Sequence, residues 1–356
     1  MMEKKYWSSR IQTLVPYVPG EHPRGRTFIK LNTNENPYPP SPAAIEAIRT
    51  ATDENLRLYP DPASMELREA LAEYYGLKAE QVFCGNGSDE VLGLCFYALF
   101  SPEKKVLFPD ITYSFYPVYT ELFGIPYEEI PLNEDFSLPV ERYLTGECGG
   151  MVICNPNAPT GQTQPVETIR RILEANPQCV VLVDEAYADF GTVSVVPLIH
   201  EYPNLLVVGT MSKSRSLAGL RIGYALGNAD LIAGVNCVKD SFNSYPVDRI
   251  AQAAGVAAVR DVEYFNEIRH KVMATRDKTT ARLRELGFEV QDSDTNFIFA
   301  RHPEKSGREL AGMLREQGIL VRRFDTPRIE EYLRISIGTD EEMEKLCSIC
   351  QEILKG

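Results

Sequence analysis

The sequence predicts an α/β protein with two parts: a large domain whose mostly parallel sheet is covered by helices on both faces, and a small C-terminal α+β domain. Apolar runs without alternation are typical of strands buried on both faces. Five such runs occur before residue 228: KVLFPD, GMVICNPN, CVVLVDEA, NLLVVGT and RIGYALG. Helical patterns lie between several of them, which favours parallel pairing. After about Asp261 the pattern changes to a long, charged helix followed by short strands and helices, which indicates a second domain.

The elements follow one another in an order that sets the expected domain boundaries. We expect an N-terminal arm over 1–41 and the large domain over 42–260, with helical patterns over 43–50, 64–75, 89–100 and 166–175. The small domain is expected over 261–356. It begins with VEYFNEIRHKVMATRDKTTARLREL, a pattern long enough to span from one domain into the next. Strand-like segments then alternate with helical patterns over 307–316 and 340–354: FEVQD, NFIFAR, ILVRRF and LRISIG.

Charge and hydropathy exclude several classes of partner. The 356 residues include 37 Lys and Arg against 50 Asp and Glu, which gives a net charge of −13. A nucleic-acid-binding protein usually carries a basic stripe, and this sequence has none, so we expect no nucleic-acid partner. The N-terminus lacks the apolar core of a signal peptide, and the longest apolar runs are far shorter than a membrane span. We therefore expect no membrane association and a cytoplasmic location.

The eight cysteines are scattered along the chain, and we expect them to be buried, reduced thiols. Cys347 and Cys350 form a C-x-x-C pair, but no second Cys or His pair is placed to complete a zinc site. Apolar residues at helical spacing around the pair indicate that both lie on a helix face. The sequence predicts no metal site.

A glycine-rich segment is the first candidate for a ligand site, because ligands of open α/β sheets lie outside the carboxyl ends of the strands. GNGSDE, residues 85–90, follows the apolar QVFC and precedes a helical pattern. Its glycines allow backbone N–H groups to face an anion at a helix N-terminus. A plain loop with Ser88 or Asp89 as the N-cap is equally compatible. The segment is not a P-loop, because the Gly-Lys-[Ser/Thr] ending is absent.

Three more expected strands are followed by candidate site residues. Asp184 ends the run CVVLVD and is followed by Tyr187; this carboxylate is either a salt-bridged structural group or a catalytic one. Lys213 lies just past NLLVVGT, and Arg221 follows it by eight residues. A lysine flanked by small hydroxyl and apolar residues is unusual, because most lysines lie on solvated faces. The turn CNPNAPTG, residues 154–161, is either a rigid holder of side-chain amides or an ordinary loop.

The order of these motifs runs from the glycine-rich loop through Tyr113 in PDITYSFY, then NPNAPTG and DEAY, to SK…R. It resembles fold-type I enzymes of the class I/II aminotransferase family, which use pyridoxal 5′-phosphate (PLP). Within that family, LNTNENPYPPSP, LRLYPDP and SKSRSLAGLRIGY are similar to histidinol-phosphate aminotransferases, and the resemblance runs from about Val15 to the end. It implies that the large domain binds PLP and that the protein is a homodimer. The implied reaction, a step of histidine biosynthesis, converts histidinol phosphate and 2-oxoglutarate into imidazole acetol phosphate and glutamate.

The resemblance also implies roles for individual residues. Lys213 would form the Schiff base with PLP and move a proton on the substrate, Asp184 would pair with the pyridine nitrogen, and Tyr187 would hydrogen-bond the O3′ oxygen. Tyr113 would stack on the ring. The implied phosphate contacts are the backbone of Ser88 and Asp89, the side chains of Thr210, Ser212 and Arg221, and Tyr59 of the neighbouring subunit.

One position departs from the family pattern. The usual turn reads Asn-Asn-Pro-Thr-Gly, and its second asparagine contacts O3′; here that position is Ala158. Either Asn157 takes over that contact through a shift of the loop, or Tyr187 alone serves O3′.

Three residues are implied to bind the substrate. Arg334 in YLRISIGT and Arg322 in ILVRRF match family arginines, and two guanidinium groups suit either a phosphate or the carboxylates of glutamate. Tyr17 would line the pocket. The alternatives are a surface ion pair for Arg322 and a core position for Tyr17.

Other functions fit parts of the same pattern. An aromatic amino-acid aminotransferase and a threonine-phosphate decarboxylase would keep the cofactor and change the substrate. A non-catalytic PLP-binding module of a transcription regulator would need an attached DNA-binding domain, for which residues 1–41 are too short.

Overall fold

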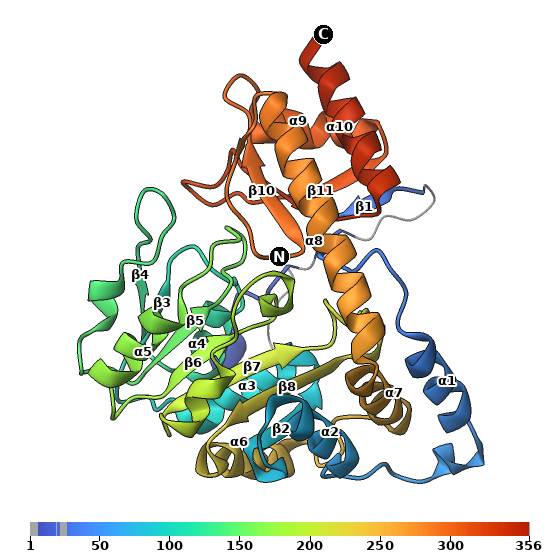
Figure 1. Cartoon of the computed structure of the whole chain (residues 1–356). Coiled ribbons are helices and arrows are strands. Elements are labelled where there is room, and N and C mark those ends of the chain that lie inside the picture. The colour runs from blue at the N-terminus through green and yellow to red at the C-terminus, as the bar shows by residue number, and fades with distance from the viewer. Residues whose placement is uncertain (1–5, 19, 22–26, 356) are drawn as a thin grey trace.

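The chain folds around two β-sheets (Figure 1). The computed structural model describes residues 6–18, 20–21 and 27–355; the other residues, including 1–5 and 22–26 of the expected N-terminal arm, lie outside the described part. The larger sheet has seven strands in the order β2-β8-β7-β6-β5-β3-β4. These strands are β2 (Val82–Asn86), β3 (Val106–Pro109), β4 (Tyr127–Ile130), β5 (Gly150–Cys154), β6 (Val181–Asp184), β7 (Leu205–Thr210) and β8 (Ile222–Gly227).

The large sheet is mostly parallel. Strands β4, β3, β5, β6 and β7 pair in parallel, and β8 is antiparallel to both of its neighbours, β7 and β2. Val181 and Val183 of β6 point into one core and Leu182 points into the other, so the strand is buried on both faces. Fully buried strands explain why the sequence shows apolar runs without alternation.

Helices cover both faces of this sheet (Figure 1). One core is packed by helices α2 (Met65–Tyr75), α5 (Val166–Ala175) and α7 (Arg249–Arg260), with α1 (Pro42–Ala51) alongside α7. The opposite core is packed by α3 (Gly87–Leu99), α4 (Tyr116–Phe123) and α6 (Ala229–Phe242). This arrangement matches the predicted mostly parallel sheet with helices on both faces.

The smaller sheet has the order β1-β11-β12-β10-β9 and contains a segment from the N-terminal part of the chain. Its strands are β1 (Ile29–Leu31), β9 (Glu289–Val290), β10 (Phe297–Arg301), β11 (Ile319–Arg323) and β12 (Leu333–Ser336). It packs with α8 (Val262–Glu285), α9 (Gly307–Glu316) and α10 (Asp340–Lys355). Strand β1 runs parallel to β11, and the segment that follows β1 contacts the large domain: Asn34 Nδ2 donates to the Tyr187 hydroxyl at 3.0 Å and Asn36 Nδ2 donates to the Lys213 carbonyl at 2.9 Å.

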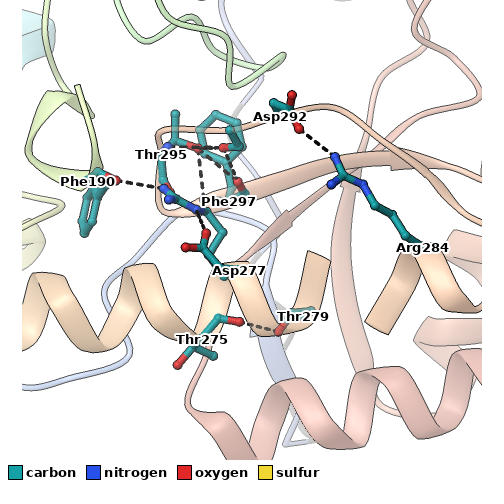
Figure 2. Close-up of polar contacts among 10 residues, drawn as sticks. Phe190, Thr275, Asp277, Thr279, Arg284, Asp292, Thr295 and Phe297 are labelled. Carbon is teal, nitrogen blue, oxygen red and sulfur yellow. Dashed lines mark hydrogen bonds and ion pairs between the residues drawn. The ribbon is translucent and has the colours of Figure 1, made fainter. Parts of the chain in front are cut away.

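The long helix α8 joins the two parts and is fastened to both (Figure 1). The guanidinium of its buried Arg276 donates hydrogen bonds to the carbonyl of Phe190 at 2.8 Å and to that of Thr295 at 3.0 Å. Asp277 accepts a third bond at 3.0 Å and balances the charge. Figure 2 shows these contacts converging between Phe190, Thr295 and Asp277. The segment that follows β6 and carries Tyr187 is thereby held against the small domain.

Seven of the eight cysteines are buried and all are free, as expected, but Cys237 is exposed, which corrects that expectation for one residue. Cys347 and Cys350 lie on the buried side of α10 in the small core. Within the described residues, no cluster of His, Cys, Asp and Glu is arranged to hold a metal ion. Among the helices described, none combines the length and apolarity needed to cross a bilayer.

Candidate active site

A cavity of about 750 Å³ lies where the carboxyl ends of the large sheet's strands face the small domain. Asp184 ends β6, Cys154 ends β5, and Lys213 follows β7. The cavity brings together eleven of the predicted site residues: Tyr17, Ser88, Asp89, Tyr113, Asp184, Tyr187, Ser212, Lys213, Arg221, Arg322 and Arg334. Segments far apart in the sequence therefore meet at the edge where an α/β sheet binds its ligands.

The glycine-rich loop and the start of helix α3 form one corner of this cavity. Helix α3 begins at Gly87, so Ser88 and Asp89 lie in its first turn, and the N-cap is Asn86 rather than either of them. Their backbone N–H groups belong to the helix N-terminus, where an anion is favoured. Arg221 donates to the Asp89 carboxylate at 3.0 Å across the corner.

Glycines make this corner possible. Gly87 has φ of +81°, and a Cβ there would collide with the guanidinium of Arg221. A Cβ on Gly223 of β8 would overlap the backbone of Gly87 and Ser88. Strand β8 and the start of α3 therefore approach too closely for any side chain to lie between them. Ser212 borders the cavity, and behind it Thr210 donates to the Ser212 hydroxyl at 3.0 Å without lining the cavity itself.

Lys213 reaches into the cavity without a carboxylate partner among the described residues. Its Nζ lies 3.4 Å from the carbonyl oxygen of Thr33 and 5.9 Å from the centre of the Tyr187 ring. Burial, reinforced by the nearby Arg334, lowers the pKa of this amine to about 8. Asn36 fixes the backbone by donating to the Lys213 carbonyl at 2.9 Å. Near neutral pH a minor fraction of the amine is therefore neutral, far more than for an ordinary lysine, and nucleophilic attack on a carbonyl requires that neutral form.

Asp184 is buried, with 3% of its surface exposed, and accepts hydrogen bonds on both carboxylate oxygens. The Tyr116 hydroxyl donates at 2.9 Å and the Ala186 N–H at 3.1 Å. Burial raises the pKa of Asp184 to about 6, although these two bonds favour the charged form. No cation pairs with it among the residues that the structure describes. A buried carboxylate without a cationic partner suits a ligand that brings its own positive charge.

Two tyrosines line the cavity together with Asp184. Tyr187 has its hydroxyl hydrogen-bonded by the Asn34 side chain at 3.0 Å, and burial raises its pKa to about 12, so it is a neutral donor. The Tyr113 hydroxyl donates to Asp89 at 2.8 Å, which holds its ring at the cavity wall. Burial likewise raises the pKa of Tyr113 well above its ordinary value.

The turn after β5 places Ala158, and not Asn157, at the cavity. The Asn157 amide donates to the Ile111 carbonyl and to Thr160, both at 2.9 Å, and accepts from Thr112 at 2.8 Å. The alternative in which Asn157 turns toward the ligand is therefore disfavoured, because all three bonds would have to break. Ala158 offers only a methyl group to the cavity.

Arg334 is a partly buried cation at the cavity. Its Nη2 donates to the Asn32 carbonyl at 3.0 Å, while its buried Nε has no hydrogen-bond partner among the described residues. Arg322 lies beside it, with Nη2 3.4 Å from the Val18 carbonyl. Burying a guanidinium without a counter-ion is costly, so this pair fits an anionic substrate group.

An aromatic wall completes the substrate side. The Tyr17 ring lies 4.7 Å from the ring of Phe115, and both line the cavity with Tyr113. Tyr17 is therefore a cavity residue and not a core residue. Tyr59 is placed elsewhere: it is 78% exposed, stacks on Tyr245 at 4.6 Å and does not line its own chain's cavity.

Several residues of the site were not predicted from the sequence. Asn34 lies in LNTNENPYPPSP, a segment noted as a motif without a role for any one residue, and its φ of +55° was not foreseeable. Tyr116 and Phe115 follow Tyr113 in PDITYSFY, but only the folded chain shows which ring faces Asp184 and which faces Tyr17.

This fold and this constellation define the protein's family. The family model described as aminotransferase class I and II matches residues 26–349. The chain therefore belongs to the aminotransferase class I and II family, and the predicted family and fold class are confirmed.

Its relatives carry a more particular name. The histidinol-phosphate aminotransferase of Marinomonas sp. (strain MWYL1) is 56% identical over 344 residues, which cover 96% of this chain and 98% of that protein. The histidinol-phosphate aminotransferase of Aromatoleum aromaticum is 52% identical over 354 residues and covers 99% of both. Among solved structures, the histidinol-phosphate aminotransferase from Sinorhizobium meliloti in complex with pyridoxal-5′-phosphate has a TM-score of 0.88 at 24% identity, covering 99% of this chain and 98% of that one, and so shares the fold.

Proposed function

We propose that this aminotransferase binds PLP and transfers the amino group of histidinol phosphate to 2-oxoglutarate, giving imidazole acetol phosphate and glutamate. The names of the relatives at 52% and 56% identity support the substrate. The observation that carries the proposal is that one cavity holds both a lysine and an aspartate that are unpaired among the described residues. Lys213 has a lowered pKa and no carboxylate partner in the described structure, and Asp184 is buried without a cation.

The lining residues fit PLP by their chemistry. The Ser88 and Asp89 N–H groups, Ser212 and Arg221 would hold the phosphate in the corner that glycines keep open. Asp184 would hold a proton on the ring nitrogen, because a positive charge beside it offsets the burial of the carboxylate. When bound, the cofactor supplies the electron sink that stabilises negative charge at the substrate Cα.

Lys213 would bind the cofactor through Nζ and, once released by the substrate, accept the proton from the substrate Cα. Its lowered pKa suits both tasks, since the amine must be neutral to act as nucleophile and base. Tyr187 would donate its hydroxyl proton to O3′, and Tyr113 would cover the ring.

Arg334 and Arg322 would bind the phosphate of histidinol phosphate in one half-reaction and a carboxylate of glutamate in the other. The unpartnered Nε of Arg334 and the adjoining guanidinium of Arg322 provide charge for both anions. The rings of Tyr17 and Phe115 would pack against the imidazole.

We further propose a cytoplasmic homodimer whose large domain covers 42–260 and whose small domain covers 261–356 together with the β1 segment. An exposed apolar surface supports the dimer: stacked Tyr59 and Tyr245 join two segments that expose Leu56, Leu58 and Phe242. Exposed apolar groups gathered in this way are typical of an interface. Tyr59 would reach the phosphate of the neighbouring subunit's cofactor.

A substrate panel tests the proposed function. We expect histidinol phosphate to convert the bound cofactor to its amino form, seen as a change in its absorption, with kcat/KM far above that of phenylalanine. If phenylalanine is the better donor, the protein is an aromatic amino-acid aminotransferase. If threonine phosphate releases carbon dioxide, it is a decarboxylase of that substrate.

A further inference from the structure

The cavity lacks the asparagine amide that the family pattern places at the O3′ oxygen. Ala158 presents a methyl group to the cavity, and the Asn157 amide is fully engaged in its own turn by three hydrogen bonds. Tyr187 is therefore the remaining side chain expected to serve the O3′ oxygen. A tyrosine hydroxyl has one proton and rotates about its bond to the ring, so something must decide where that proton points.

The partners of Asn34 decide the direction. The Asn34 backbone N–H donates to Ser336 Oγ at 2.8 Å, so the Ser336 hydroxyl is free to donate to Asn34 Oδ1, at 3.0 Å. This places Oδ1 toward Ser336 and Nδ2 toward Tyr187, whose hydroxyl oxygen accepts at 3.0 Å. Because Nδ2 can only donate, the Tyr187 proton is directed away from Asn34.

Asn34 is itself held rigidly. It is 1% exposed, and its carbonyl accepts a bond from Asn296 Nδ2 at 3.0 Å. Its φ of +55° is a conformation that asparagine tolerates better than most residues. Ser336 lies at the end of β12 and Tyr187 just past β6, so Asn34 links the small sheet to the large-domain side of the cavity.

We propose that Asn34 is a positioning residue that directs the Tyr187 hydroxyl proton into the cavity, where it serves the O3′ oxygen in place of the amide that Ala158 lacks. This inference rests on the proposed binding of PLP. A donor at O3′ draws negative charge onto itself and makes the nitrogen of the Lys213–cofactor linkage less basic. If the Tyr187 hydroxyl proton no longer points at O3′, this nitrogen therefore becomes more basic.

The test is the pH midpoint at which the absorption of the PLP-loaded enzyme changes. Asn34→Gly keeps the backbone bond to Ser336 and allows φ of +55°, and it should raise the midpoint by about 0.5–1 pH unit. That shift corresponds to about 0.7–1.4 kcal/mol at 1.36 kcal/mol per unit, the size of one ordinary hydrogen bond. Tyr187→Phe should raise the midpoint at least as far, and adding Asn34→Gly to Tyr187→Phe should change nothing further.

Asn296→Ala is the matched control, because it removes a bond to the same residue's carbonyl without changing the Asn34 amide. It should leave the midpoint where it is. The inference is overturned if Asn34→Gly leaves the midpoint unchanged, if its shift persists in the Tyr187→Phe background, or if Asn296→Ala shifts the midpoint equally. A wild-type chain that shows no cofactor absorption would instead refute the proposed function.

Discussion

Replacing Asp184 by asparagine is expected to stabilise the cofactor-free chain and to slow turnover by the PLP-loaded enzyme. In the cofactor-free chain the carboxylate is buried without a cation, and its pKa rises from 3.8 to about 6. Asparagine has nearly the same size and keeps both neighbours: its Oδ1 can accept from the Ala186 N–H and its Nδ2 can donate to the Tyr116 oxygen. The fold should therefore be retained.

The sign of the stability effect follows from proton linkage. A carboxyl group whose pKa is higher in the folded chain than in the unfolded chain binds its proton more tightly when folded, so stability falls as pH rises from about 4 to about 6. A difference of about 2 pKa units corresponds to about 3 kcal/mol at 1.36 kcal/mol per unit. At pH 8 the cofactor-free Asp184→Asn chain should be more stable than wild type by up to about 3 kcal/mol, and the difference should vanish below about pH 4.

The assay is urea unfolding of both cofactor-free chains across this pH range, with turnover of the PLP-loaded enzymes measured beside it. A charge-assisted hydrogen bond is worth about 1.5–3 kcal/mol, so its loss should slow kcat by about 10- to 150-fold. A cofactor-free variant less stable than wild type at pH 8, or a loaded variant that turns over at the wild-type rate, would contradict this role of Asp184.

Three further changes probe the rest of the site. Gly223→Ala should weaken PLP binding by about tenfold or more, since a Cβ there overlaps the backbone of Gly87 and Ser88 at the proposed phosphate site. Gly219→Ala, with open space around it, should leave PLP binding unchanged. Equal PLP dissociation constants for the two variants would argue against this phosphate site. Histidinol, which lacks the phosphate, should have a kcat/KM roughly two orders of magnitude below that of histidinol phosphate, because each charged contact is worth about 1.5–3 kcal/mol. Arg334→Lys should slow both half-reactions and reduce the ratio of these two kcat/KM values. An unchanged ratio would exclude Arg334 as the phosphate ligand. Mixing Tyr59→Phe chains with Lys213→Ala chains should restore part of the activity, since one hybrid site would be intact; an active monomer would rule out the shared site.

Much of the fold could be predicted because the large sheet is buried on both faces. Runs such as CVVLVDEA have no alternation, and their ends mark the edge where polar residues gather, so Asp184 and Lys213 stand out in the sequence alone. The addition of β1 to the small sheet was less visible, because three residues pairing with a strand almost 300 positions later leave no local pattern.

What the sequence could not supply was the direction of side chains. Asn157 and Ala158 are neighbours, yet only the hydrogen bonds to Ile111, Thr160 and Thr112 show that the amide turns away from the cavity. The capped-loop alternative expected Ser88 or Asp89 as the N-cap of α3, and in the folded chain the N-cap is Asn86. These outcomes depend on partners distant in sequence, which spacing alone does not reveal.

The most direct test of Lys213 as the cofactor-binding residue is to reduce the PLP-loaded protein with borohydride and map the labelled peptide by mass spectrometry. Reduction fixes the bond between the cofactor and the amine that carries it. We predict one label per chain, on Lys213, and no label in a Lys213→Ala chain incubated with PLP in the same way. A label on any other lysine, or a PLP-loaded chain that reduction leaves unlabelled, would contradict this assignment.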